Sequence, residues 1–275
     1  MFERENMQTV EIDAHSPWLP NFRELWQYRN LALLLAYRNI RVRYKQAVLG
    51  FLWVLLTPAA FTLIFLFFYR LLPFKASGDL PYVPVVYSGM ILWQFISRVL
   101  NDGGTSLTAN ANIITKVYFP REVFPISVIF SALFDFLISF ALLFGILLWF
   151  DLPISPRVLI APFFVLWISL FAFSAILWLS AIDGVFRDLR HALPLVLQLG
   201  MFVSPIAYIT SAVVPSEWMW LYEYNPVVAP IEGFRWAVIQ GAPFMTVSAA
   251  LKSIFVTIVL LASGAIFFAR MERTI

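Results

Sequence analysis

The chain has 275 residues, of which 61% are hydrophobic and 13% are charged. Soluble globular proteins have roughly 45–50% apolar and about 25% charged residues, so this composition cannot supply a water-exposed surface. It excludes a soluble nucleic-acid-binding protein, a disordered chain and an ordinary cytosolic enzyme. The 28 Phe and 10 Trp are typical of helices whose outer faces contact lipid. The sequence has no Cys, which excludes disulfide bonds and thiolate metal sites within it.

Six long intervals with at most one charged residue predict six transmembrane helices, because a helix needs about 20 apolar residues to cross a bilayer. The predicted fold class is therefore all-α, a polytopic membrane protein whose transmembrane domain covers residues 46–275. The predicted spans are 46–69, 80–107, 123–150, 158–182, 192–213 and 246–269. The second of them extends the charge-free interval 80–97 by a polar helical continuation outside the hydrocarbon.

Two charged residues interrupt these intervals. Lys252 lies near one end of the last span, where its long side chain is expected to extend to the polar interface. Asp135 lies in the middle of the third span, and an acid at that depth has either a function or a polar partner on a neighbouring helix. Pairing with such a partner is the favoured interpretation.

The distribution of basic residues predicts that both termini are cytoplasmic. With this orientation, four segments on the cytoplasmic side hold 14 of the 19 Lys and Arg residues, as the positive-inside rule requires. These segments are 1–45, 98–122, 183–191 and 270–275. The first 16 residues carry four acids and no apolar run, so no cleavable signal peptide is expected.

Residues 20–46 predict an amphipathic helix in the cytoplasmic membrane interface, within a cytoplasmic head of residues 1–45. Its apolar face is predicted to hold Phe22, Leu25, Trp26, Leu33, Tyr37 and Ile40. Its basic residues either only orient the first span or also attract an anionic lipid phosphate. The residues that would attract the phosphate are Arg38, Arg41, Arg43 and Lys45.

The segment 110–125, NANIITKVYFPREVFP, joins the second and third predicted spans. Its apolar residues predict one face of a short helix, with Lys116 and Arg121 facing water, and Pro125 suits the first turn of the third span. The segment is either an ordinary loop or a short amphipathic helix that a peripheral partner binds in a groove.

The segment 214–245 is largely apolar, but four prolines prevent a single span. Two short half-helices on the non-cytoplasmic side are predicted, re-entrant at the outer mouth. Its aromatic residues either lie at the membrane boundary, which is the favoured interpretation, or face a pathway for sugar rings. They are Trp218, Trp220, Tyr222 and Tyr224.

Four segments in the same order along the chain carry a family resemblance. They are RYKQAVLGFLWVLLTP (43–58), the VYFPRE core of 110–125, FRDLRHALPLVLQLGMFVSPIAY (186–208) and YNPVVAPIEGFR (224–235). The chain resembles the membrane subunits of ABC transporters that export cell-surface polysaccharides, and among them the O-antigen and teichoic-acid permeases. The resemblance runs from about residue 22 to the end.

The resemblance implies a homodimer in the bacterial inner membrane, with two copies of a cytoplasmic nucleotide-binding ATPase subunit, surrounding membrane lipids and a lipid-linked polysaccharide as substrate. It makes 22–38 the interface helix, 112–122 the coupling helix that contacts the ATPase, and 214–245 the outer gate helices. The first and fifth spans then face each other across the dimer and line the channel.

The same resemblance assigns candidate residues to each role. Candidates for ATPase coupling are Asn112, Ile113, Ile114, Lys116, Val117, Tyr118, Phe119, Arg121 and Glu122. Candidates for lining the polysaccharide channel are Phe61, Phe65, Tyr69, Phe202 and Tyr208. Candidates for the outer gate are Trp218, Trp220, Tyr222, Tyr224, Glu232 and Arg235. Arg38, Arg41 and Lys45 are the candidates for the phosphates of the lipid carrier.

The residues themselves indicate that the chain does not hydrolyse ATP. None of its 11 glycines is followed by Lys, so it contains no G-x-x-x-x-G-K-[ST] loop for phosphates. ATP and Mg are expected on the partner subunit, with no cofactor, metal or nucleic acid bound by this chain. The alternatives are a permease for capsular polysaccharide or teichoic acid and, from another class, a polytopic membrane enzyme acting on lipid-linked sugars.

Overall fold

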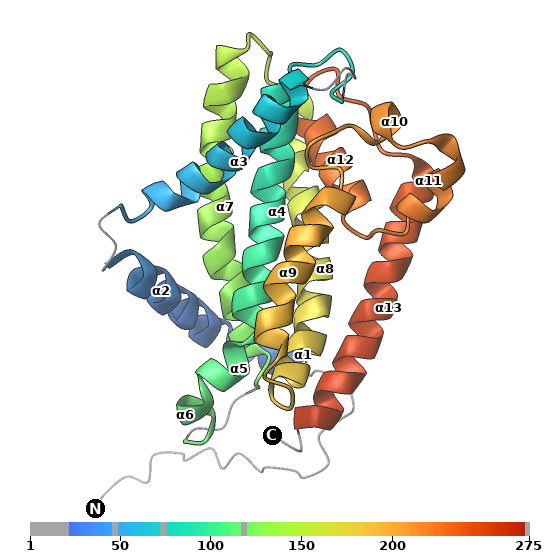
Figure 1. The fold of residues 1–275 in the computed structure, drawn as a ribbon. Helices are drawn as coiled ribbons and strands as arrows, with labels where there is room; N and C mark the ends of the chain where they lie inside the picture. Colours follow the sequence, from blue (N-terminus) through green and yellow to red (C-terminus); the bar gives the residue numbers. More distant parts are fainter. Residues whose placement is uncertain (1–21, 46–48, 72–75, 117–119, 273–275) are drawn as a thin grey trace, which may run out of the picture.

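The computed structural model describes residues 22–45, 49–71, 76–116 and 120–272. These residues are nearly all helical, which confirms the all-α class. Within the described ranges there is no β-strand, only a single isolated bridge between Ile154 and Ile239. The helices run largely alongside one another in an elongated bundle (Figure 1).

Five apolar helical segments of the described chain are long enough to cross a membrane. They are α3 (Leu52–Leu71), α4 (Tyr82–Gly104), α7 (Val123–Trp149), α8 (Ala161–Asp183) with the preceding 3-10 helix η1 (Pro156–Ile160), and α13 (Val247–Glu272). They coincide with five of the six predicted spans. Pro125 lies in the first turn of α7, as predicted.

The fifth predicted span, 192–213, is not one continuous helix. Helix α9 (Leu189–Val203) has 15 residues and therefore rises only about 22 Å, less than the hydrocarbon thickness of about 30 Å. Pro205 follows Ser204, and the residue before a proline disfavours the helical conformation. Ser204 therefore has an extended backbone, which ends α9. The chain becomes helical again only at α10 (Thr210–Val213).

Helix α4 is the most buried of the long helices and lies at the centre of the bundle. It packs against α7 and α8 along their lengths and also contacts α3 and α9. Helix α13 packs on α8. In Figure 1, α3 crosses the bundle at an angle, and its N-terminal end lies away from the other helices. This tilt opens space between α3, α4 and α7.

At one end of the bundle lie α10, α11 (Ser216–Tyr222) and α12 (Val228–Val238) (Figure 1). The two half-helices predicted within 214–245 correspond to α11 and α12. Pro215 precedes α11 as its N-terminal cap residue, and Pro226 lies in the connection to α12. Pro215 and Pro226 thus separate short helices, whereas Pro230 lies within α12.

At the opposite end lie α1 (Phe22–Gln27), α5 (Ser106–Ala109) and α6 (Ala111–Ile114) (Figure 1). The predicted continuous helix of 112–122 is wrong, because α6 ends at Ile114 and Arg121 lies in a turn before α7. Pro120 has no N–H group to continue a helical hydrogen-bond pattern. Residues 117–119 lie outside the described residues.

Helix α2 (Arg29–Lys45) forms the predicted helix before the first span. Ala32, Leu35 and Ala36 are buried, and α2 packs against α7. Leu33 and Tyr37, assigned to the apolar face, are exposed. The small alanine side chains allow the two backbones to approach closely, and this close packing decides which face is buried.

Candidate functional site

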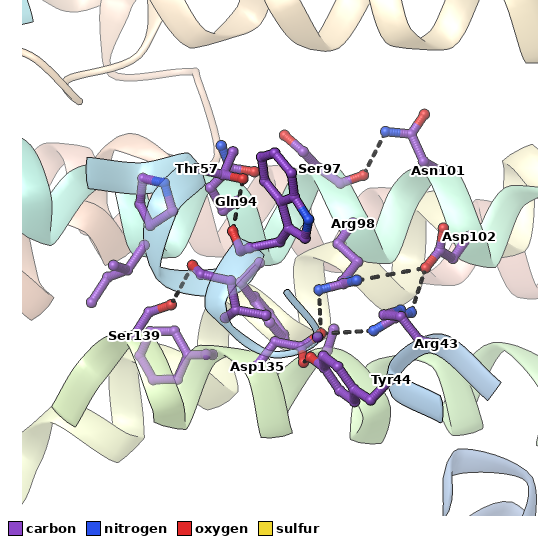
Figure 2. Close-up of a pocket in the computed structure, with 18 residues that line it drawn as sticks. Arg43, Tyr44, Thr57, Gln94, Ser97, Arg98, Asn101, Asp102, Asp135 and Ser139 are labelled. Atoms are coloured by element: carbon purple, nitrogen blue, oxygen red, sulfur yellow. Dashed lines mark hydrogen bonds and ion pairs between the residues drawn. The ribbon is translucent and has the colours of Figure 1, made fainter. Parts of the chain in front are cut away.

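A buried carboxylate on α7 is the centre of the most polar region inside the bundle. Asp135 is 4% exposed. One of its oxygens, Oδ2, accepts a hydrogen bond from Arg43 Nη1 at 2.7 Å and another from Arg98 Nη1, and Oδ1 accepts one from the Tyr44 hydroxyl (Figure 2). These groups come from α2, α4 and α7. The favoured prediction for Asp135, a polar partner on a neighbouring helix, is confirmed.

A second carboxylate lies at the outer edge of this cluster. Asp102 Oδ2 is 3.0 Å from Arg43 Nη2 and 3.8 Å from Arg98 Nε, and the Asp102 side chain is 46% exposed. The two arginines and two acids together have no net charge. Asp135 is thus the buried, fully engaged counter-ion, and Asp102 is the exposed, loosely held one.

These charged groups form part of the wall of a cavity of about 420 Å³ between α3, α4 and α7. The remaining wall is partly apolar and partly polar, with one exposed indole. The apolar residues are Val54, Pro58, Ile91, Phe95, Ala132 and Phe136, and the others include Trp53, Thr57, Gln94, Ser97, Asn101 and Ser139. A second hollow of about 600 Å³ lies alongside, and Arg43 and Asp102 line both.

A proline explains how α3 is held beside this cavity. Pro58 lies inside α3 and has no N–H group, so the carbonyl of Val54, four residues earlier, has no partner in its own helix. The Ser139 hydroxyl on α7 donates a hydrogen bond to that carbonyl at 3.2 Å (Figure 2). A free carbonyl is costly in an apolar environment, so this bond favours contact between α3 and α7.

Two polar links tie the short helices at the α6 end to the longer helices. Arg38 Nη2 donates to Asn110 Oδ1 at 2.7 Å and so joins α2 to the start of α6. Thr108 at α5 donates to Asp183 Oδ2 at 2.6 Å. Asp183 in turn accepts two hydrogen bonds, of 2.7 and 2.9 Å, from Arg190 on α9. The segment around 108–110 is thus connected to α2 on one side and to α8 and α9 on the other.

The candidate lipid-phosphate residues separate in the structure. Arg38 is half-buried and engaged with Asn110, whereas Arg41 and Lys45 are exposed on α2. The candidate coupling residues separate too. Asn112 and Lys116 are exposed, Ile113, Ile114 and Arg121 are half-buried, and Glu122 is buried. Val117, Tyr118 and Phe119 lie outside the described residues.

Only two of the candidate channel residues contact each other as aromatic rings, and two others pair with residues outside the set. Phe65 on α3 contacts Phe202 on α9 edge to face, with ring centroids 6.1 Å apart. The Tyr208 hydroxyl lies 3.0 Å from that of Tyr222, a gate candidate. Tyr69 instead stacks on Tyr82 of α4, with centroids 3.9 Å apart. Phe61 is half-buried against the core.

Arg235 on α12, a gate candidate, is buried and holds the break after α9. Its guanidinium donates to the carbonyls of Pro205 at 2.7 Å, Ile206 at 3.3 Å and Tyr208 at 3.2 Å. These carbonyls lie where the chain is not helical, and Arg235 supplies the donors that the helix would have supplied. A Cβ at Gly89 of α4 would lie 2.8 Å from the Ile206 oxygen, so Gly89 allows the break to pack there.

The connection from α11 to α13 depends on Glu223. This buried carboxylate accepts hydrogen bonds from Thr246 and Ser248, both at 2.6 Å, and from Lys252 at 2.9 Å. Burial opposes the charged form, but these three donors outweigh it and hold the pKa of Glu223 below its ordinary value. Lys252, whose side chain is predicted to extend to the interface, pairs with Glu223 at this end of the bundle. The other gate candidates are exposed or half-buried: Trp218, Trp220, Tyr224 and Glu232.

The sequence patterns did not predict several residues of the site. Arg98, Asp102 and Ser139 line the cavity, and none of them was among the candidate site residues. One signal was present: Arg98 and Asp102 are four residues apart and so lie on one helix face. The described residues contain no cluster of three or more His, Cys, Asp or Glu that could hold a metal ion.

Five helices long and apolar enough to cross a membrane, two of which carry the buried Arg98–Asp135 ion pair, define a multi-pass membrane protein. The family model described as ABC-2 type transporter matches residues 30–239, and the chain belongs to that family. The chain is 28% identical over 258 residues to an O-antigen export system permease protein of Myxococcus xanthus, covering 91% of this chain and 96% of the relative.

Other relatives match over much of their length as well. An O-antigen export system permease protein of Klebsiella pneumoniae is 28% identical over 214 residues, 77% of this chain and 81% of the relative. A polysialic acid transport protein of Escherichia coli is 26% identical over 240 residues, 86% of this chain and 91% of the relative.

Replacing Asp135 with Asn should lower the free energy of unfolding by about 3–5 kcal/mol, because it leaves two partly buried arginines without their main counter-ion. Unfolding in mixed micelles of increasing dodecyl sulfate measures this loss. Asp188→Asn removes an exposed acid elsewhere and should change the value by less than about 0.5 kcal/mol. A loss for Asp135→Asn as small as that of Asp188→Asn would contradict the assigned role.

Proposed function

We propose that this chain is the membrane subunit of an ATP-driven exporter that moves a lipid-linked, O-antigen-like polysaccharide out of the cytoplasm across the bacterial inner membrane. The observation that carries the proposal is the family match over residues 30–239, together with relatives named as O-antigen export permeases. The relative named for polysialic acid transport supports a second candidate substrate, a capsular polysaccharide. No particular observation favours a membrane enzyme.

In this proposal a separate cytoplasmic subunit binds ATP and Mg and supplies the energy. The 275 residues carry no phosphate-binding loop of the G-x-x-x-x-G-K-[ST] type, which supports this division of labour. The end of the bundle with α1, α2, α5 and α6 faces the cytoplasm and the ATPase. The end with α10, α11 and α12 faces outward, with α11 and α12 as re-entrant gate helices.

The interrupted segment formed by α9, residues 204–209 and α10 is the fifth of six membrane crossings. Non-helical backbone is tolerated at membrane depth where protein groups satisfy it, and the bonds from Arg235 supply that condition. The exposed apolar faces of α3 and α9 support a homodimer whose two copies enclose the channel. On α3 this face includes Leu63, Ile64, Phe67 and Phe68, and on α9 it includes Leu195, Val196, Leu199 and Phe202.

The polar links around 108–110 supply a route for coupling. A push of the ATPase on 110–116 is transmitted through Asn110 and Arg38 to α2, which leads directly into α3. It is also transmitted through Thr108 and Asp183 to Arg190 at the start of α9. Both channel-lining helices therefore receive the displacement. The aromatic rings of Phe65 and Phe202 then provide flat surfaces for sugar rings.

Replacing Tyr118 and Phe119 with Glu should abolish co-purification of the chain with its ATPase subunit, because charged groups disrupt an apolar contact in the partner's groove. The same two changes at Trp218 and Trp220, at the opposite end of the bundle, serve as the control and should leave co-purification intact. Undiminished binding by the Tyr118/Phe119 variant would refute the coupling assignment.

Depleting the protein in its own cell should cause a lipid-linked polysaccharide to accumulate on the cytoplasmic side, where it remains inaccessible to added glycosidases until the membrane is opened. Mass spectrometry of the extracted lipid then identifies the polymer. Normal export and surface display after depletion would refute the transport function.

A further inference from the structure

The cavity between α3, α4 and α7 has an uneven distribution of counter-ions. Two guanidinium groups, Arg43 and Arg98, both donate to the same oxygen of Asp135, so one carboxylate must balance two cations. Asp135 is buried and also accepts a hydrogen bond from the Tyr44 hydroxyl. Among the described residues, Asp102 is the acid that balances the remaining positive charge.

Asp102 is well placed to leave the arginines. Its side chain is 46% exposed, its contact with Arg43 is a single hydrogen bond of 3.0 Å, and its distance to Arg98 of 3.8 Å is too long for one. It lies at the boundary between the cavity of about 420 Å³ and the neighbouring hollow of about 600 Å³. An exposed ion pair of this kind contributes little to stability, so water can replace the arginines around Asp102 at small cost.

We propose that this cavity is a binding site for a phosphate group, in which the phosphate replaces the carboxylate of Asp102 on Arg43 and Arg98. Guanidinium groups bind phosphate through paired N–H donors, and Asp135 holds both of them in position. Polar side chains without a hydrogen bond to the protein in the described structure, Gln94 and Ser97, line the same space and suit the group that carries the phosphate. The inference rests on the proposed function insofar as the phosphate belongs to a lipid-linked substrate.

Of the four basic residues that the sequence predicted to attract a phosphate, this site uses only Arg43. Arg38 is occupied by Asn110, and Arg41 and Lys45 are exposed to the outside of α2, where they attract anions without enclosing them. Arg43 points the opposite way, into the bundle. The phosphate of a lipid would reach it past the N-terminal end of α3, which lies away from the other helices (Figure 1).

The test uses the full chain in nanodiscs of dioleoyl phosphatidylcholine, with dioleoyl phosphatidate as the probe and native mass spectrometry to count bound phosphatidate. The variant Asp102→Asn should bind phosphatidate about tenfold more tightly, because a competing like charge has been removed. The variant Arg43→Gln should bind it about tenfold more weakly, because a hydrogen bond to a charged group has been lost. The matched controls Asp188→Asn and Arg187→Gln change the same charges on an exposed loop and should leave binding unchanged.

Two results would overturn the proposal. The first is equal affinity of Asp102→Asn and Asp188→Asn, and the second is a loss with Arg41→Gln as large as that with Arg43→Gln, which would indicate general surface attraction. A misfolded variant cannot imitate the tighter binding expected of Asp102→Asn. Adding inorganic phosphate separates the sources: displacement of the lipid means that the phosphate group alone suffices, and retention means that the lipid headgroup is required.

Two separate measurements distinguish the failure of this phosphate site from the failure of the proposed transport function. Phosphatidate binding is measured without the ATPase subunit, and co-purification with that subunit is measured separately. Absent binding with intact co-purification would overturn the phosphate site alone. Failure of the unaltered chain to co-purify with any ATPase would instead contradict the transporter.

Discussion

A carboxylate inside an apolar helix bundle must be paired, and the pairing of Asp135 determines much of the arrangement around it. Burial of an unpaired charge costs several kcal/mol, so Asp135 recruits donors from two other helices. Arg98 comes from the central α4, whereas Arg43 and Tyr44 come from the end of α2. Helix α2 is therefore held against α7 by a buried ion pair at one end and by Ala32, Leu35 and Ala36 along its length.

The same requirement, that polar groups be satisfied away from water, recurs wherever a helix is interrupted. Pro58 frees a carbonyl in α3, and Ser139 satisfies it. The break after α9 frees several, and Arg235 satisfies them. In both cases a side chain from another helix fills the gap, so each interruption fixes a tertiary contact. The interrupted helices α3 and α9 are those that the proposed function makes the channel wall.

Charge-free intervals predicted five spans closely, because the cost of charge in lipid leaves a direct trace in the sequence. Asp135 was also predicted to be paired, but its partners are distant in sequence and no local pattern names them. Helix periodicity predicted an apolar face of α2 that includes Leu33 and Tyr37, and both side chains are exposed; it did not predict that α2 buries a second face, on which the small Ala32 and Ala36 allow close packing. Pro205 ended α9 inside a continuous apolar interval, a signal that was present in the sequence but was not weighed against hydropathy.

The central claim is that Asp135 holds α2 in place, and a distance measurement tests it directly. The chain has no Cys, so single cysteines at exposed Tyr37 on α2 and Leu137 on α7 can carry spin labels without background. Labelled chain is diluted into unlabelled chain, and pulsed electron resonance gives the distance distribution. The account predicts a single narrow distribution that broadens to longer distances in Asp135→Asn. An unchanged narrow distribution in that variant would show that apolar contacts alone hold α2, and would contradict the account.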